Sequence, residues 1–266
     1  MESHQASKCL STDTTEEMGI ETKTRQSMRT ILVYPLPMEN EDVLKTFLPF
    51  AHRFRETYLA NDPGHQHDLI VVCNGADPND EVRGVFDKCG ARYERYDGAG
   101  FDLGSQQTIA QSHRNALQVN FTSRCYFHRP NWLWKLVVAF EAYGDGLYGV
   151  SASREGGNLH VCTRAFMYWT ETFRNFTTSI VSRDQGVDFE VTKGKSISDW
   201  YSSLALARRI VHWDRTVNLD VFDTVPNRFR DGDQSAMLVF DRHSDLYRDG
   251  DETEKKRLAT LCIKGQ

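Results

Sequence analysis

Short apolar runs alternate with longer amphipathic segments over the first 150 residues of the chain. Runs of four to eight apolar and β-branched residues that are bounded by turn residues are typical of buried strands. Five such runs predict strands: 30–34, 68–74, 91–96, 116–122 and 147–153. The segments between them predict helices: 41–59, 79–89, 105–113 and 130–143. This alternation favours an α/β fold with a mostly parallel central sheet and helices on both faces.

The alternation weakens after residue 153. A strand is predicted at 159–163, helices at 164–176 and 196–210, and a mixed segment at 186–195. Residues 1–28 are rich in Ser, Thr, Glu and Lys, and they predict a disordered N-terminal tail. We therefore expect a single domain over 29–266, in which 29–153 binds a ligand and 154–266 forms the other side of a cleft.

Composition narrows the classes of protein. The 266 residues include 39% hydrophobic and 11% aromatic residues, enough for a sizeable core, and the net charge of −5 argues against a nucleic-acid binder. No run approaches the roughly 18 apolar residues of a transmembrane segment. The six cysteines are scattered without a C-x-x-C pair, which indicates a reducing, cytoplasmic location and argues against structural zinc.

A glycine-rich loop at 97–107 follows the third predicted strand and leads into a helix. It contains three glycines and two aspartates, Asp97 and Asp102. Ligands of open α/β sheets bind at the carboxyl ends of strands, so this loop is a candidate site. Its G-x-G-x-x-x-G spacing departs from the dinucleotide fingerprint, and the chain contains no P-loop. A turn that uses glycine only for its backbone freedom is the alternative.

A second segment, 121–133, ends the fourth predicted strand with Thr122-Ser123-Arg124 and starts a helix with Pro130. Together the two segments resemble GT-A-type glycosyltransferases, including the rhamnan-synthesis-like group with its N-x-G-F-D-x-G loop. The resemblance covers residues 29–153. It implies a GT-A-like, Rossmann-type sandwich that transfers a sugar from a nucleotide-sugar donor to a glycan or small-molecule acceptor.

The chain departs from this family at the metal site. Thr122-Ser123-Arg124 stands where the family has Asp-x-Asp, which argues against a bound Mn²⁺ or Mg²⁺. An arginine also binds a diphosphate and neutralises its charge, so Arg124, with Arg129, is a candidate replacement for the metal. The alternative is a catalytically inactive, GT-A-like binding or scaffold module.

The resemblance and the strand ends together predict the donor-binding residues. Residues at the ends of the first three strands would contact the nucleoside, Asp102 and Gln106 would hold hydroxyls, and Arg124 would face the diphosphate. The full predicted set is Tyr34, Pro35, Asn74, Asp97, Asp102, Gln106, Ser123 and Arg124.

A catalytic base is expected in the second half, because an inverting transfer deprotonates the acceptor hydroxyl. Asp188 and Glu190 would share one face of a strand, and Glu190 is the preferred base. A solvated acidic turn is the alternative.

The 164–176 segment contains three candidates for binding the acceptor: Arg164, Tyr168 and Trp169. For the two aromatic residues, packing in a helix core is the alternative. His243 is a candidate late ligand for a metal or diphosphate, or else an ordinary loop residue.

Overall fold

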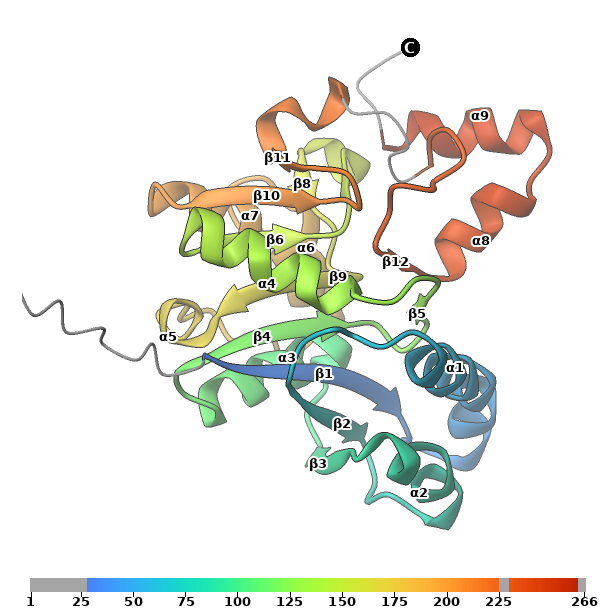
Figure 1. The fold of residues 1–266 in the computed structure, drawn as a ribbon. Helices are drawn as coiled ribbons and strands as arrows, with labels where there is room; N and C mark the ends of the chain where they lie inside the picture. The colour runs from blue at the N-terminus through green and yellow to red at the C-terminus, as the bar shows by residue number, and fades with distance from the viewer. Residues whose placement is uncertain (1–27, 225–229, 263–266) are drawn as a thin grey trace, which may run out of the picture.

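A computed structural model describes residues 28–224 and 230–262, and its centre is an eight-stranded mixed sheet (Figure 1). The strand order is β11-β10-β6-β9-β4-β1-β2-β3. Four of the seven strand pairings are parallel. The predicted α/β class with a mostly parallel sheet is confirmed. The predicted tail, apart from Met28, lies outside the described residues.

The first half of the chain forms the parallel strands that the apolar runs predict. These strands are β1 (Arg29–Pro37), β2 (Asp68–Asn74), β3 (Arg92–Tyr96) and β4 (Ala116–Phe121). Strand β1 pairs in parallel with β2 on one side and with β4 on the other. Their carboxyl ends therefore meet at one edge of the sheet, where loops can form a ligand site.

Helices cover both faces of the sheet. On one face lie α1 (Glu41–Ala60), α2 (Asp80–Phe86) and α4 (Trp132–Tyr143), which pack on the largest core cluster. Helix α1 begins at Asn40, whose side chain accepts a hydrogen bond from the backbone N–H of Val43. On the opposite face lies α3 (Phe101–Ser112), whose Ile109 packs with the alternate residues of β1 and β2.

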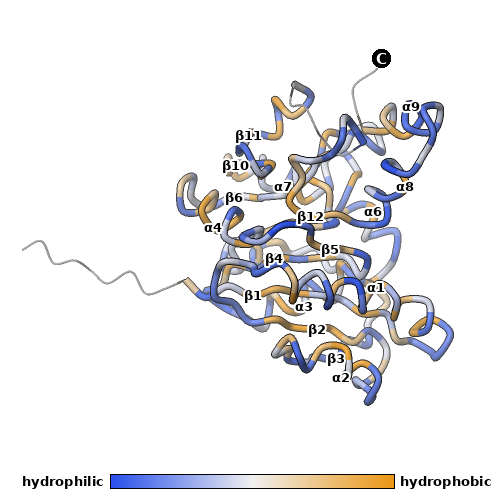
Figure 2. The backbone as a smooth tube through the Cα atoms, turned by 45° about the vertical axis from the view of Figure 1, so that its right-hand side comes forward, coloured by the Kyte–Doolittle hydropathy of each residue, from blue (hydrophilic) through white to orange (hydrophobic). Residues whose placement is uncertain are grey.

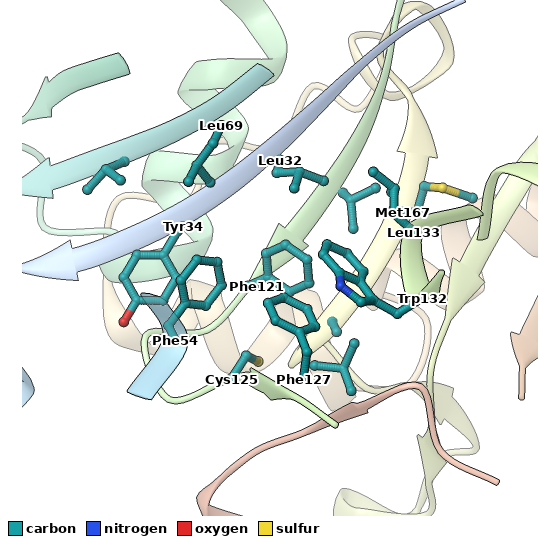
Figure 3. Close-up of a cluster of buried hydrophobic side chains, with 14 of the residues drawn as sticks. Leu32, Tyr34, Phe54, Leu69, Phe121, Cys125, Phe127, Trp132, Leu133 and Met167 are labelled. Atoms are coloured by element: carbon teal, nitrogen blue, oxygen red, sulfur yellow. The ribbon is translucent and has the colours of Figure 1, made fainter. Parts of the chain in front are cut away.

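Aromatic rings fill the centre of the larger core (Figure 3). Phe54 of α1 lies 4.3 Å from Tyr34 of β1, measured between ring centroids, and Phe127 stacks on Trp132 at 3.9 Å. All four side chains are almost completely buried. Burial of such rings contributes roughly 2–3 kcal/mol each, which fixes the position of β1 and α1 beside the strand ends. Figure 2 shows that the strands at the centre of the sheet are largely hydrophobic.

The second half completes the sheet with β6 (Gly146–Gly149), β9 (Ala165–Trp169), β10 (Ala207–Val211) and β11 (Thr216–Asn218). Strand β9 lies antiparallel between β4 and β6. The predicted helix at 164–176 is therefore wrong, except for the short α5 (Thr170–Phe173). The run Ala-Phe-Met-Tyr-Trp is covered on both faces, so its polarity pattern does not distinguish a strand from a buried helix.

Two more segments differ from their predictions. The mixed segment at 186–195 belongs largely to helix α6 (Arg183–Val191). The predicted helix at 196–210 divides into α7 (Ile197–Ser203) and strand β10, separated by Ala205 with its positive φ of 56°. Helices α5, α6 and α7 pack with α3 on the second face.

The remaining elements are short or peripheral. Two small sheets pair β12 (Val239–Phe240) with β5 (Tyr126–Phe127), and β7 (Ala152–Ser153) with β8 (His160–Val161). Helices α8 (Arg242–Asp249) and α9 (Glu252–Thr260) follow β12. Three 3₁₀ turns span Asp87–Cys89, Glu155–Gly157 and Leu219–Thr224. Within the described ranges, no helix has the length and apolar character that crossing a bilayer requires.

The glycine loop joins the two halves of the chain. Gly100 lies so close to the backbone oxygen of Ile180 that an added Cβ would overlap it, and that Cβ would also lie 2.8 Å from the Cα of Gly104. The Gln107 side chain donates to the oxygen of Thr178 (2.8 Å) and accepts from the N–H of Ile180 (2.9 Å). Glycine at position 100 thus permits close contact between α3 and the segment that leads into α6.

We expect Gly100→Ala to lower the free energy of unfolding by more than about 2 kcal/mol, because backbone atoms have to move to admit the methyl group. Gly84→Ala is the matched control. Its added Cβ meets no atom within 4 Å, and it lies inside α2, so alanine should stabilise the protein by about 0.5–1 kcal/mol. Urea unfolding of both variants measures the difference. Equal effects would contradict the close packing at Gly100.

Candidate ligand-binding site

A cavity of about 600 Å³ opens at the carboxyl ends of β1 and β4. Its walls come from the end of β1, the second turn of α1, the start of α3, the segment after β4, Thr163 and helix α6. The lining residues with functional side chains or apolar surface include Phe47, Phe101, Asp102, Gln106, Thr122, Ser123, Arg124, Arg183, Val187 and Glu190. The glycine loop and the Thr122-Ser123-Arg124 segment, which are distant in sequence, therefore meet at one site.

Two cationic side chains line this cavity, Arg183 of α6 and Arg124 after β4. Arg124 packs on aromatic rings. Its guanidinium carbon lies 4.7 Å from the ring centroid of Phe47 and 5.4 Å from that of Phe50, both on α1. Within the described part of the chain, the guanidinium forms no ion pair, and its buried Nε has no hydrogen-bond partner. Contact with aromatic rings stabilises a cation without occupying its N–H groups. The N–H groups of Arg124 are thus available to an anionic ligand.

Asp102 lies in the same cavity at the start of α3. Burial raises the pKa of this carboxyl from its ordinary 3.8 to about 7, because a charged carboxylate loses its hydration there. The positive charge of Arg124 and the backbone N–H of Ser123 act in the opposite direction and lower the pKa. Asp102 therefore changes its charge near neutral pH, as acid–base groups of functional sites often do.

Buried contacts fix the segment after β4 from two sides. The Tyr34 hydroxyl donates to the backbone oxygen of Ser123 (2.7 Å), and the Gln106 side-chain amide donates to the oxygen of Phe121 (2.7 Å). The side-chain oxygen of Gln106, Oε1, is buried and has no partner among the described residues. These bonds hold the backbone next to Arg124 in a defined position, which limits the reorganisation needed on ligand binding.

Helix α6 forms the wall opposite β4. Its N-cap is Ser182, whose hydroxyl accepts from the N–H of Gln185. Glu190 lines the cavity, and its carboxylate accepts a hydrogen bond from the N–H of Thr163 (3.3 Å). Asp188 lies outside this lining and pairs with Lys195 (2.9 Å), which lowers its pKa. The predicted shared face is wrong because residues two apart on a helix point in different directions.

Four of the predicted donor-binding residues lie outside the cavity lining. Tyr34 and Pro35 are buried within β1, and Asp97 pairs with Arg95 at the surface (2.9 Å). Asn74 is 3% exposed at the end of β2, and neither atom of its side-chain amide has a hydrogen-bond partner among the described residues. Asp102, Gln106, Ser123 and Arg124 line the cavity.

The three candidate acceptor residues also lie elsewhere. Arg164 bonds to Asp241 (3.2 Å) and to the Ser151 hydroxyl (2.8 Å). Tyr168 is completely buried, while Trp169 packs with Phe140. The prediction placed all three on a helix beside the site. Tyr168 and Trp169 instead lie in strand β9, where adjacent side chains point to opposite faces of the sheet.

Two further candidates lie apart from the cavity. The Nδ1 atom of His243 lies 3.4 Å from the Nη2 atom of Arg230. Arg129 is exposed, and its guanidinium lies over the ring of Trp213 (5.5 Å). Neither residue lines the cavity that contains Arg124.

The donor atoms of the cavity do not fit a divalent metal. Its carboxylates, Asp102 and Glu190, come from different walls, and the guanidinium of Arg124 lies beside Asp102. Over residues 28–224 and 230–262, no cluster of three His, Cys, Asp or Glu side chains could hold an ion. Mn²⁺ and Mg²⁺ require several oxygen ligands that converge on one point.

Sequence reasoning missed several residues of the cavity. Phe47, Phe101, Arg183 and Val187 line it without having been predicted. Phe101 was detectable because it stands between Gly100 and Asp102 in the glycine loop. The others lie on helices whose approach to the strand ends depends on tertiary packing.

No family model and no curated protein match this sequence. Solved structures with partial similarity include the galactosyltransferase LgtC in complex with donor and acceptor sugar analogs (7% identity, TM-score 0.41, 55% of this chain and 60% of that chain). A second is the mannosyltransferase PcManGT from Pyrobaculum calidifontis in complex with GDP-Man and Mn²⁺ (10% identity, TM-score 0.41, 57% of this chain and 48% of that chain). A third is a CMP:2-keto-3-deoxy-manno-octonic acid synthetase in complex with CTP (10% identity, TM-score 0.40, 56% of this chain and 77% of that chain). The match thus spans about half of PcManGT and three-fifths of LgtC. These similarities are remote and concern the fold.

The raised pKa of Asp102 predicts a pH-dependent stability. Ionisation is less favourable in the folded protein, so the contribution of Asp102 is greatest below about pH 4 and declines as the pH rises to about 7. Relative to wild type, Asp102→Asn should therefore gain stability over this range, by roughly 2–4 kcal/mol at pH 8. Urea unfolding at several pH values measures this difference. A difference that stays constant with pH would contradict the shift.

Proposed function

We propose that this protein is a glycosyltransferase whose cavity binds a nucleotide sugar and transfers the sugar to an acceptor hydroxyl. The observation that carries the proposal is the guanidinium of Arg124, which lines the cavity without an ion pair among the described residues. An arginine that faces a cavity beside buried polar groups favours an anionic ligand with several oxygen atoms, such as a diphosphate.

Arg124 would stabilise the departing nucleoside diphosphate. When the bond between the anomeric carbon and the diphosphate oxygen breaks, negative charge develops on that oxygen. A fixed guanidinium stabilises this charge, and such a group contributes roughly 10²–10³ in rate. The rings of Phe47 and Phe50 and the bonds that hold Ser123 support its position. The resemblance to GT-A-type glycosyltransferases supports this role, since it implies that Thr122-Ser123-Arg124 stands where those enzymes have Asp-x-Asp.

Asp102 and Gln106 would hold hydroxyl groups of the donor. Below about pH 7 Asp102 is protonated and donates a hydrogen bond without repelling the phosphates. The side-chain Oε1 of Gln106, which has no partner among the described residues, would accept from a ribose or sugar hydroxyl. Asn74, with both amide atoms unpaired near the end of β2, is proposed to contact the nucleoside.

Glu190 is the proposed base for an inverting transfer. Its carboxylate would accept the proton of the acceptor hydroxyl while the acceptor oxygen bonds to the anomeric carbon and the nucleoside diphosphate leaves. The bond from the Thr163 N–H orients the carboxylate toward its wall of the cavity. Glu190 is preferred to Asp188 for this role, because Asp188 lies outside the lining and pairs with Lys195.

A binding module without catalytic activity is the second candidate. The absence of carboxylates at Thr122-Ser123-Arg124 favours it. Such a module would bind the nucleotide sugar through Arg124 and release no nucleoside diphosphate, so turnover separates the two functions.

We expect one or more UDP-, GDP- or dTDP-sugars to raise the melting temperature of the wild-type protein in excess EDTA. Arg124→Ala should weaken the affinity roughly 10- to 100-fold, because a charge-assisted contact with the diphosphate is lost. Arg129→Ala is the matched control, since that exposed guanidinium lies over Trp213 outside the cavity. Calorimetry measures the dissociation constants. Unchanged affinity in Arg124→Ala, or no shift with any sugar nucleotide, would refute the donor site.

Glu190→Gln should lower kcat by roughly 10²–10⁴-fold while the donor affinity stays within about twofold, because general-base catalysis is removed and the diphosphate contacts remain. Asp188→Asn is the matched control on the same helix and should retain activity. Release of the nucleoside diphosphate measures turnover. Equal losses in both variants would point to damage to α6 and would contradict a catalytic role for Glu190.

A further inference from the structure

An exposed aromatic side chain lies at the mouth of the cavity. Phe101 is 54% exposed, more than the exposed aromatics Trp134 (45%) and Tyr143 (48%). Its backbone has a φ of 51°, in the left-handed region that non-glycine residues rarely adopt. An exposed ring on a strained backbone stabilises the fold little. Strained positions persist where the surrounding structure imposes them, and they occur often at ligand sites.

The surroundings of Phe101 keep its backbone in this conformation. Gly100, immediately before it, is packed against Ile180 and Gly104, and Asp102 after it is partly buried in the cavity lining. The Gln107 bonds to Thr178 and Ile180 attach the same helix to the opposite wall. The ring at position 101 is therefore presented to the cavity mouth by a loop with little freedom to withdraw it.

A second apolar side chain lines the cavity from α6. Val187 is 50% exposed and stands three residues before Glu190, so both lie on the same side of the helix. Phe101 and Val187, which we call the apolar rim, thus border the cavity next to its two carboxylates. Arg183, four residues before Val187, also lines the cavity from α6, whereas Arg124 lies on another wall, at the end of β4 and against α1.

We propose that the apolar rim selects acceptors in which an apolar group, aryl or alkyl, lies next to the reacting hydroxyl. This inference rests on the proposed function. A hydroxyl bonded to Glu190 brings the neighbouring part of the acceptor to within one helical turn of Val187. Contact with Phe101 and Val187 then removes apolar surface from water on both molecules. The donor diphosphate is held at Arg124 instead, so the rim contributes to acceptor affinity and leaves donor affinity unchanged.

The test compares p-nitrophenyl and methyl glycosides of glucose and galactose as acceptors, with the sugar nucleotide that gives the largest thermal shift. We expect the wild-type protein to show a kcat/KM about tenfold higher for the aryl glycosides, as burial of one apolar group typically provides. Phe101→Ala should reduce this preference to about twofold or less through a higher KM, with the donor dissociation constant unchanged. Phe101→Leu should retain most of the preference.

Trp134→Ala is the matched control, because it removes an exposed aromatic ring from α4, outside the cavity lining. It should retain the preference. Equal kcat/KM for aryl and methyl glycosides in the wild type would overturn the acceptor inference and leave the donor site intact. The same conclusion would follow if calorimetry in the presence of donor showed that no aryl glycoside binds. Weaker donor binding in Phe101→Ala would assign the ring to the nucleotide. Absence of binding by all sugar nucleotides would overturn the proposed function as well.

Discussion

Close packing of the glycine loop against Ile180 is the constraint on which the rest of the site depends. Gly100 has no room for a side chain there, and the Gln107 side chain bonds to the same segment at both Thr178 and Ile180. This contact holds α6 beside α3, across the strand ends from β4. Glu190 is also linked to the end of β4, because it accepts from the N–H of Thr163, and the next residue, Arg164, accepts from the N–H of Thr122 (2.9 Å). The cavity therefore results from backbone contact between the two halves of the chain.

Electrostatics of the cavity follow from the same packing. Burial disfavours the carboxylate of Asp102, while Arg124 beside it favours that charge, and the balance brings the pKa to about 7. The guanidinium itself is stabilised by two aromatic rings, whose contact leaves its hydrogen-bonding edge available. The lining thus combines two arginines with an acid whose pKa lies near neutrality, which supports the proposed binding of a nucleotide sugar.

The first half of the chain was predictable because its signals are local. Apolar runs identified β1 to β4, and the strand-to-helix turn identified the glycine loop. Asp102, Gln106, Ser123 and Arg124 were predicted and line one cavity, since parallel strands place their carboxyl ends at one edge. The second half was predicted less well. The 165–169 run is buried on both sides within the sheet, and such a run lacks the period that separates strand from helix.

The sequence by itself determined the α/β class, the position of the glycine loop and the polar Thr122-Ser123-Arg124 segment after the fourth strand, because periodicity, glycine content and residue identity are local properties. Tertiary structure decided which side chains share the cavity. Because 183–191 is a helix, Asp188 and Glu190 do not share a face. The packing also leaves Arg164, Tyr168 and Trp169 outside the cavity lining. It brings Phe101 and Val187 to the mouth of the cavity. Such proximity depends on long-range packing, which a linear pattern of residues does not specify.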